Sequence, residues 1–265
     1  MSVVAEAHGP VVITGAAGGI GAAVAEAFAR LGAPIALLDH DPAVHEVMAG
    51  LGVDGYAGVV DVTDRGAVDR AFDEAIAAVG GLAVVVHAAG VLATGPVAEL
   101  TEAQWDRCIA VNATGTVNVT RRAAAELVAA GGGSIVVVTS NAGAAPRAGM
   151  AAYGASKAAA ASFTRSLGLE VAGSGVRVNL VSPGSTDTPM LREMWSADGP
   201  PDGLAAAARA RIITGDPDAY KLGIPLRRVA AAADVAAAVV FLASDAARHI
   251  TLHDLRVDGG ATLDI

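Results

Sequence analysis

The chain has 265 residues, of which 53% are hydrophobic but only 3% aromatic, so its core must consist mainly of Ala, Val, Leu and Ile. This length suits one large α/β domain. The formal net charge of −9 disfavours a surface for nucleic acid or anionic membranes, and we expect a small-molecule partner instead.

The cysteine content and the apolar runs bear on the cellular compartment. Cys108 is the only cysteine, so no internal disulfide can form. The first residues lack a basic stretch followed by an apolar one, and no apolar run is long enough to span a membrane. We therefore expect a cytoplasmic protein without a nucleic-acid or membrane partner, and we predict no metal site.

Apolar runs that favour strands alternate with helical runs along the chain. These runs are 10–14, 34–38, 55–60, 82–86, 135–139, 176–181 and 254–257. Such alternation is typical of a parallel sheet with helices on both faces. Because no linker or internal repeat divides the chain, we predict one doubly wound Rossmann-type domain, residues 1–265, with a seven-stranded parallel sheet.

A glycine-rich turn separates the strand 10–14 from the helical run 22–31. Glycines here allow a tight turn and let the backbone approach a pyrophosphate, which would lie at the helix N-terminus. Because the turn stands between a strand and a helix, it predicts a dinucleotide site. The cofactor contacts predicted in this turn are Gly15, Gly19, Ile20 and Gly21.

Asp39 ends the second predicted strand, 34–38. A carboxylate there can accept hydrogen bonds from a ribose and repels a 2′-phosphate, so NAD is favoured over NADP. Ala17 and His40 supply no fixed cation for a phosphate, although His40 leaves residual NADP use open. The competing interpretation is that Asp39 caps a helix before Pro42.

Tyr153 and Lys157 lie four residues apart in an Ala-rich run, so on a helix they share one face. A nearby cation stabilises phenolate over phenol and favours tyrosine as a general base. Ser140 follows the strand 135–139, where its hydroxyl would emerge toward the same place. The alternative is a surface Tyr and Lys on an amphipathic helix.

Residues 101–130 read as one long helix with Thr101 as its N-cap and a stop at 131–133. Asn112 lies in its middle, where an asparagine side chain competes for backbone hydrogen bonds. We regard Asn112 as a candidate site residue. An exposed helical asparagine is the alternative.

Residues 185–220 lose regular periodicity, and we predict that they form a substrate lid. An ordinary hydrophobic satellite helix is the competing interpretation. The Ala-rich runs 205–208 and 230–233 carry charges at intervals and are predicted to be helical.

The motifs together resemble the short-chain dehydrogenase/reductase family, and the resemblance covers essentially the whole chain. The glycine-rich turn and the set Ser140, Tyr153 and Lys157 carry it. One central motif departs from the family pattern, because His87 stands where the family usually has an asparagine that joins strands. We interpret His87 as a buried structural substitute that can make stability sensitive to pH.

The family resemblance implies a role for each catalytic candidate. Tyr153 takes the hydroxyl proton, and Ser140 orients that hydroxyl. Lys157 holds the nicotinamide ribose and lowers the pKa of Tyr153, which itself borders the cofactor. Asn112 distorts its helix and helps to hold a water that relays protons.

The resemblance also implies further cofactor contacts and an assembly. The implied contacts with NAD are Asp61, Val62, Ala89, Gly90, Tyr153, Lys157, Pro183, Gly184, Thr186 and Thr188. For Asp61 and Val62 the alternative is simple capping of the following helix by Thr63 or Asp64. A homotetramer formed through helices 101–130 and 151–172 is implied as well.

Segments 150–157, 170–177, 181–188 and 221–226 are similar to a subfamily that oxidises 2,3-dihydro-2,3-dihydroxybenzoate during catechol siderophore formation. This similarity implies NAD-dependent oxidation of a cyclohexadiene diol carboxylate. Alternatives are the amino analogue 2,3-dihydro-3-hydroxyanthranilate as substrate and an NADP-dependent ketoreductase. A non-catalytic cofactor-sensing or scaffold protein is a further alternative, which the retained catalytic set disfavours.

A carboxylate substrate needs a cation, and Arg147 stands in the loop between Ser140 and Tyr153. A guanidinium can bind a carboxylate through two parallel hydrogen bonds. A solvated loop arginine is the alternative, and Arg192 or Lys221 could do the same task. The predicted substrate contacts are Arg147, Met150, Met190 and Arg192.

Overall fold

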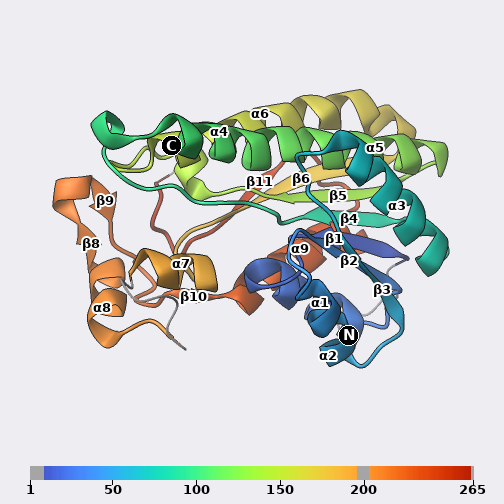
Figure 1. The fold of residues 1–265 in the computed structure, drawn as a ribbon, viewed down its shortest axis with the longest axis horizontal. Coiled ribbons are helices and arrows are strands. Elements are labelled where there is room, and N and C mark those ends of the chain that lie inside the picture. The colour runs from blue at the N-terminus through green and yellow to red at the C-terminus, as the bar shows by residue number, and fades with distance from the viewer. Residues whose placement is uncertain (1–8, 196–202, 264–265) are drawn as a thin grey trace.

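The computed structural model describes residues 9–195 and 203–263. Its main sheet has seven parallel strands in the order β11-β6-β5-β4-β1-β2-β3, as Figure 1 shows. The strands are β1 (Val11–Thr14), β2 (Ile35–Asp39), β3 (Gly55–Val59), β4 (Val84–His87), β5 (Gly133–Val138), β6 (Val176–Pro183) and β11 (Asp254–Val257). The predicted seven-stranded parallel sheet is confirmed.

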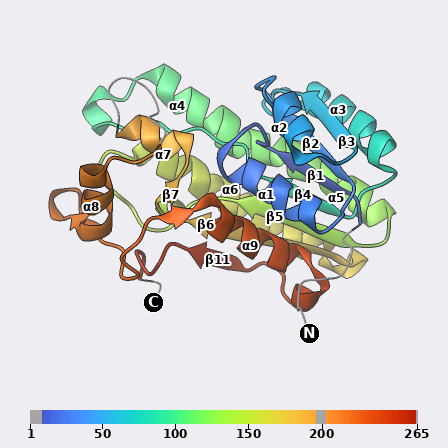
Figure 2. The same cartoon turned by 90° about the horizontal axis from the view of Figure 1, so that it is seen from below.

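Helices cover both faces of the sheet (Figures 1 and 2). One face carries α1 (Gly19–Arg30), α2 (Val44–Leu51) and α9 (Ala232–Ala243), and the other carries α3 (Arg65–Val79), α5 (Gly115–Ala129) and α6 (Ala151–Val171). Successive strand residues point to opposite faces, so Val86 packs in the first layer and Val85 in the second. The strands are therefore buried on both sides, as the apolar runs predicted.

The predicted helix 101–130 is a continuous helical run with a change of geometry in its middle. It consists of α4 (Glu102–Cys108), a π-helical turn η2 (Ile109–Thr114) and α5. Thr101 is the N-cap, because its Oγ1 accepts from Gln104 N at 3.2 Å. The π-helical turn contains Asn112, so the expected distortion lies where the poorly helical residue stands.

Short elements lie beyond the carboxyl ends of the main strands. They are β7 (Thr186–Asp187), α7 (Pro189–Met194), α8 (Ala206–Thr214), β8 (Gly215–Asp216), β9 (Lys221–Leu222) and β10 (Ala230–Ala231). The 3-10 turns are η1 (Val97–Glu99), η3 (Asn141–Gly143), η4 (Ala172–Ser174), η5 (Pro217–Ala219) and η6 (Asp245–Ala247). No helix in the described ranges is long and apolar enough to cross a membrane.

The described residues of the segment predicted as a lid divide between a pocket and a hydrophobic cluster, and its role as a lid stays a prediction. Met190 and Met194 of α7 line a pocket, whereas Leu204 and Ile212 belong to a small separate hydrophobic cluster. Residues 196–202 of this segment lie outside the described residues. The helical prediction for 230–233 is partly wrong, because Ala230–Ala231 forms β10, which pairs in parallel with β7.

His87 ends β4 beside Thr14 of β1, and its Nδ1 lies 2.7 Å from Thr14 Oγ1. The side chain is fully buried, and burial together with the charge of Lys157 lowers its pKa to about 3. The imidazole is therefore neutral at neutral pH. It joins two neighbouring strands, as the structural interpretation of His87 predicted.

Candidate active site

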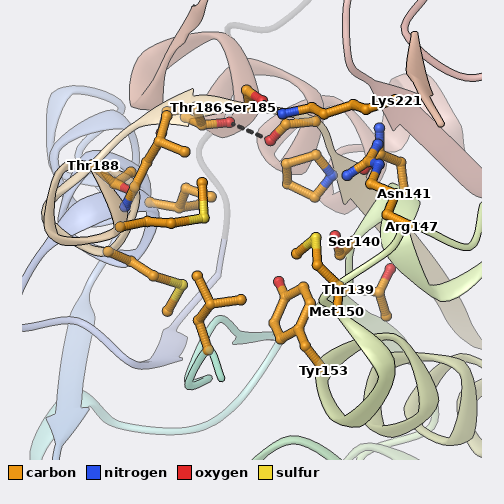
Figure 3. A pocket seen from close by; sticks show the side chains of 17 residues that line it. Thr139, Ser140, Asn141, Arg147, Met150, Tyr153, Ser185, Thr186, Thr188 and Lys221 are labelled. Carbon is orange, nitrogen blue, oxygen red and sulfur yellow. Dashed lines mark hydrogen bonds between the residues drawn. The ribbon is translucent and has the colours of Figure 1, made fainter. Parts of the chain in front are cut away.

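One pocket lies at the carboxyl ends of β5 and β6, where these strands face α7 (Figure 3). Its volume is about 120 Å³, the same order as a cavity that holds one benzene ring. The lining includes Ser140, Arg147, Met150 and Tyr153 from the segment after β5, and Pro183, Gly184, Thr186, Thr188, Met190 and Lys221 from β6 and the segments after it. None of its lining residues is an aspartate or a glutamate, whereas Arg147 and Lys221 bring positive charge to the lining; the carboxylates that act on them, Asp258 and Asp216, lie outside it.

The structure brings Ser140, Tyr153 and Lys157 together. Ser140 follows β5, and its hydroxyl hydrogen-bonds with Tyr153 and accepts from Ala142 N at 3.1 Å. Lys157 lies one turn beyond Tyr153 on α6, with its Nζ 6.0 Å from the centre of the phenol ring. This Nζ also donates to the Val138 carbonyl at 3.1 Å, which fixes the side chain against β5.

The electrostatics of this set involve Arg147 as well as Lys157. Burial raises the pKa of Tyr153, and the Ser140 hydrogen bond and the positive charge of Arg147 act against that increase. Burial lowers the pKa of Lys157 to about 8. The charge of Arg147 is therefore one influence that favours the phenolate, and the expected effect of Lys157 on the pKa of Tyr153 stays a prediction.

Asn112 connects the π-helical turn to the neighbouring elements. Its Oδ1 accepts from Val91 N at 2.8 Å, and its Nδ2 donates to Val91 O and to Ser156 Oγ, both at 2.9 Å. A Cβ added to Gly90 would lie 3.1 Å from Lys157 Nζ and 3.2 Å from Asn112 Oδ1. Gly90 therefore lets the lysine and the asparagine approach one another.

The glycine-rich turn is tightly packed and leads into a helix without a side-chain cap. A Cβ on Gly21 would lie 1.9 Å from the Gly15 carbonyl oxygen, and Gly15 has φ +74° and contacts Ala89. α1 begins without a side-chain cap, so its first N–H groups are available to a phosphate. A Cβ on Gly19 would lie 3.5 Å from Thr188, which places the turn beside the pocket.

Asp39 is buried at the end of β2 and holds the turn by hydrogen bonds. Its Oδ2 accepts from Ala17 N at 2.8 Å, and its Oδ1 accepts from Asp41 N at 3.0 Å and lies 2.9 Å from His40 Nδ1. The alternative capping role is not observed, because α2 has Ala43 at its N-cap position.

The other predicted cofactor residues lie along the same edge of the sheet. Asp61 and Val62 follow β3; Asp61 is exposed and accepts from Thr63 N at 2.8 Å. The cap of α3 is Asp64, which accepts from Ala67 N at 3.0 Å. The capping of α3 by Asp64 is therefore observed. Asp61 takes no part in it, and its side chain is exposed to solvent.

Two of the three candidate cations line the pocket. Among the ion pairs of the described residues, neither Arg147 nor Lys221 has an acidic partner, and both side chains are half-buried. Burial lowers the pKa of Lys221, and the charge of Arg147 lowers it further. A bound anion would relieve this repulsion.

Arg192 is a correction to the predicted substrate contacts. Its Nε donates to Asp187 Oδ1 at 2.7 Å, and Arg209 pairs with the same carboxylate at 3.1 Å. Arg192 does not line the pocket, although its neighbour Leu191 does. The ion pair with Asp187 holds the guanidinium of Arg192 outside the pocket lining.

Asn141 lines the pocket and was missed by the sequence analysis. It is fully buried, and its Nδ2 donates to Asp258 Oδ2 at 3.1 Å. The only available signal was its position directly after Ser140.

Comparison with known proteins identifies the family. A family model described as "Enoyl-(Acyl carrier protein) reductase" matches residues 15–262. The chain belongs to the short-chain dehydrogenase/reductase family. That description is the name of the family model and does not define the reaction of this member.

Three similar proteins illustrate the range of names within this fold. A 2,3-dihydro-2,3-dihydroxybenzoate dehydrogenase of Bacillus subtilis (strain 168) is 42% identical over 257 residues, which cover 96% of this chain and 95% of that protein. The vibriobactin-specific enzyme of the same name from Vibrio cholerae serotype O1 is 38% identical, with 96% of each chain covered. A crystal structure described as ribose-5-phosphate isomerase from Brucella melitensis 16M has a TM-score of 0.86 at 34% identity, covering 98% of this chain and 95% of that chain.

Proposed function

We propose that this protein oxidises 2,3-dihydro-2,3-dihydroxybenzoate to 2,3-dihydroxybenzoate with NAD. The observation that carries the proposal is a ring-sized pocket in which Ser140 and Tyr153 share the lining with two cations, Arg147 and Lys221, and with no acidic side chain. A ring alcohol that bears a carboxylate matches both features. The similar dehydrogenases named for this diol carboxylate support the same substrate.

The proposed chemistry separates the alcohol proton from the hydride. Tyr153 acts as the general base for the hydroxyl proton, and the Ser140 hydroxyl orients the substrate oxygen. The positive charge of Arg147 favours the phenolate form that this step needs. NAD, when bound, accepts the hydride from the ring carbon. The dienone product can tautomerise to a catechol, which favours oxidation.

The chain offers a coherent set of contacts for NAD. We propose that Gly15, Gly19, Ile20 and Gly21 contact the phosphates, that Asp39 accepts from the adenosine ribose, and that Tyr153 and Lys157 bind beside the nicotinamide ribose. Further proposed contacts are Asp61, Val62, Ala89, Gly90, Pro183, Gly184, Thr186 and Thr188. The uncapped N-terminus of α1 and the buried Asp39 carboxylate support this arrangement. We place Asn112 in the proton relay through its position beside Gly90 and Lys157.

The amino analogue 2,3-dihydro-3-hydroxyanthranilate is the second candidate substrate. An ammonium substituent on the ring would bring a third positive charge to a pocket that already contains Arg147 and Lys221. The charge of the pocket therefore favours the hydroxyl substrate. We further propose that the reaction is cytoplasmic and supplies a catechol for siderophore or related biosynthesis.

The test uses purified protein with NAD or NADP and a panel of substrates. The panel contains the diol carboxylate, its amino analogue, a cyclohexadiene diol without the carboxylate, and ribose 5-phosphate. We expect the highest kcat/KM with NAD and the diol carboxylate, with 2,3-dihydroxybenzoate identified by mass spectrometry. Absence of NADH formation with this pair would overturn the proposal, and isomerised ribose 5-phosphate would support a different activity.

Tyr153→Phe should abolish turnover of the diol carboxylate, because it removes the hydroxyl that takes the proton. NAD binding, measured by calorimetry, should persist because the rest of the site is unchanged. Tyr56→Phe is the matched control: the Tyr56 hydroxyl donates to Glu74 at 2.6 Å and lies outside the pocket lining. Turnover by Tyr153→Phe close to that of the control would reject the general-base assignment.

A further inference from the structure

The chain contains very few primary amines, and two of them lie at the candidate active site. Lys157 and Lys221 are the only lysines among its 18 lysine and arginine residues. Lys157 is 5% exposed, and its Nζ donates to the Val138 carbonyl at 3.1 Å. Lys221, in contrast, is half-buried and lines the pocket. Lys221 is therefore the lysine that a molecule entering the pocket can reach.

The β8–β9 hairpin brings Lys221 to the pocket. Asp216 of β8 stands opposite Lys221 of β9 in this antiparallel pair. The Asp216 carboxylate, however, pairs with Arg211 Nη2 at 2.7 Å. The Nζ of Lys221 donates instead to Ser185 Oγ at 3.4 Å, and Figure 3 shows the lysine reaching toward this serine. The nitrogen is thus positioned by a neutral hydroxyl, which does not hold a proton on it as a paired carboxylate would.

The surroundings of Lys221 favour its neutral amine form. Burial lowers the pKa of Lys221 and the charge of Arg147 lowers it further, whereas the charge of Asp216 acts in the opposite direction. The neutral amine is the form of lysine that attacks carbonyl groups. Arg147 lines the same pocket, and a guanidinium can bind a carboxylate there. A nucleophile and an anion-binding group therefore share one ring-sized pocket.

We propose that Lys221 is a covalent capture site for ring aldehydes that carry a carboxylate. Arg147 binds the carboxylate, and Lys221 Nζ attacks the carbonyl carbon. A C–N bond forms and the C–O bond breaks. The oxygen leaves as water with the two hydrogens of the neutral amine, so the step needs no oxidant or reductant. Water reverses the resulting imine. This inference does not depend on which alcohol the protein oxidises.

The experiment labels the purified protein, without added nicotinamide, with 3-formylbenzoate. Sodium cyanoborohydride reduces any imine to a stable secondary amine, and mass spectrometry of the intact chain and of its peptides counts and locates the adducts. We expect one adduct, at Lys221. It should form faster than with benzaldehyde by roughly tenfold or more, the scale of one charged hydrogen bond. Excess benzoate, which has the carboxylate but no aldehyde, should slow the labelling.

Three variants separate the nucleophile from the anion-binding group. Lys221→Arg should form no adduct in the pocket, because the guanidinium stays protonated. Arg147→Ala should lose most of the preference for 3-formylbenzoate over benzaldehyde. Arg192→Ala is the matched control, since Arg192 pairs with Asp187 and does not line the pocket. It should keep the wild-type preference.

Labelling at Lys157 or at the α-amino group in place of Lys221 would overturn the proposal. Equal labelling rates with 3-formylbenzoate and benzaldehyde would overturn it too, as would unchanged labelling of Lys221→Arg. If Lys221→Arg does not fold, the position of the adduct in the wild type decides by itself. Because labelling is measured without turnover, it is expected even if the diol carboxylate is not oxidised. The capture site and the proposed function can therefore fail separately.

Discussion

Arg147 can act in two ways, although it forms no ion pair among the described residues and the charge of Asp258 acts on it from outside the pocket lining. It lines the pocket at the end where an anion would bind, and its charge counters the increase that burial causes in the pKa of Tyr153. Lys157, in contrast, donates to the Val138 carbonyl and has its own pKa lowered by burial. One arginine can therefore connect substrate selection with the readiness of the base.

Arg147→Ala should lower kcat/KM for the diol carboxylate. The loss of transition-state stabilisation should be roughly 2 kcal/mol, the scale of a lost charged hydrogen-bond partner. Removing the positive charge should also raise the pKa of Tyr153, so the pH-rate profile should move to higher pH. An uncharged ring alcohol should recover wild-type rates at high pH, whereas the carboxylate should not. Steady-state kinetics over a range of pH measure both effects.

The control for this prediction is Arg192→Ala, because Arg192 pairs with Asp187 and does not line the pocket. It should leave the ratio of rates for the carboxylate and the uncharged alcohol unchanged. Equal losses on both substrates at every pH in Arg147→Ala would assign the residue to support of its loop.

The spacing of residues in the sequence predicted which side chains meet when these residues are close along the chain. It did not predict contacts between residues that are far apart along the chain. Ser140, Tyr153 and Lys157 could be predicted to meet because a strand end and one helix face position them. Asn141 could not be recognised, because its partner Asp258 lies 117 residues further along. Arg192 was wrongly assigned, since its spacing did not show that Asp187 would hold its guanidinium.

At the scale of elements, His87 makes the joint between β1 and β4 sensitive to acid. Its pKa in the folded state is about 3, below the ordinary value of 6.5. Below pH 6.5 the unfolded chain therefore binds a proton that the folded chain excludes. The contribution of neutral His87 to the free energy of unfolding is fully present above pH 6.5. It is lost as the pH falls toward 3, at about 1.4 kcal/mol per pH unit.

His87→Asn should flatten the pH dependence of the free energy of unfolding in this window, because an asparagine does not titrate. Urea unfolding of the wild type and the variant over the window measures the slope. His45→Asn, at an exposed position on α2, should keep the slope of the wild type. An unchanged slope in His87→Asn would show that other groups cause the acid sensitivity.

The long elements were predictable because each has a recognisable sequence pattern. The strands are continuous apolar runs, and the helices have amphipathic periodicity. The short elements were not predictable. β10 has two residues and exists because it pairs with β7, which lies more than forty residues earlier in the chain. The π-helical turn at Asn112 was anticipated as a distortion from the family resemblance, whereas the sequence alone showed only that asparagine is a poor residue for the interior of an α-helix.

At the scale of the whole molecule, we propose a homotetramer formed through α4, α5 and α6. Each of these helices exposes a large apolar side chain: Trp105 is 42% exposed, Val128 is 38% exposed and Leu169 is 69% exposed. The three helices lie side by side in one layer, which suits helix packing between subunits.

Light scattering at micromolar concentration should give the mass of four chains. The Leu169→Arg variant should form smaller oligomers than the wild type, because an interface would bury the new charge without a partner. Val53→Arg, at an exposed apolar position outside these helices, should not change the mass. A stable wild-type monomer would reject the tetramer.

The hydrogen bond between Asn141 and Asp258 has a consequence for refolding. It joins a strand end near the middle of the chain to a residue that follows the last strand, β11. During renaturation, helices can form early from local contacts, but this wall of the pocket cannot close until β11 has docked on β6. Recovery of turnover should therefore lag behind recovery of the circular dichroism signal.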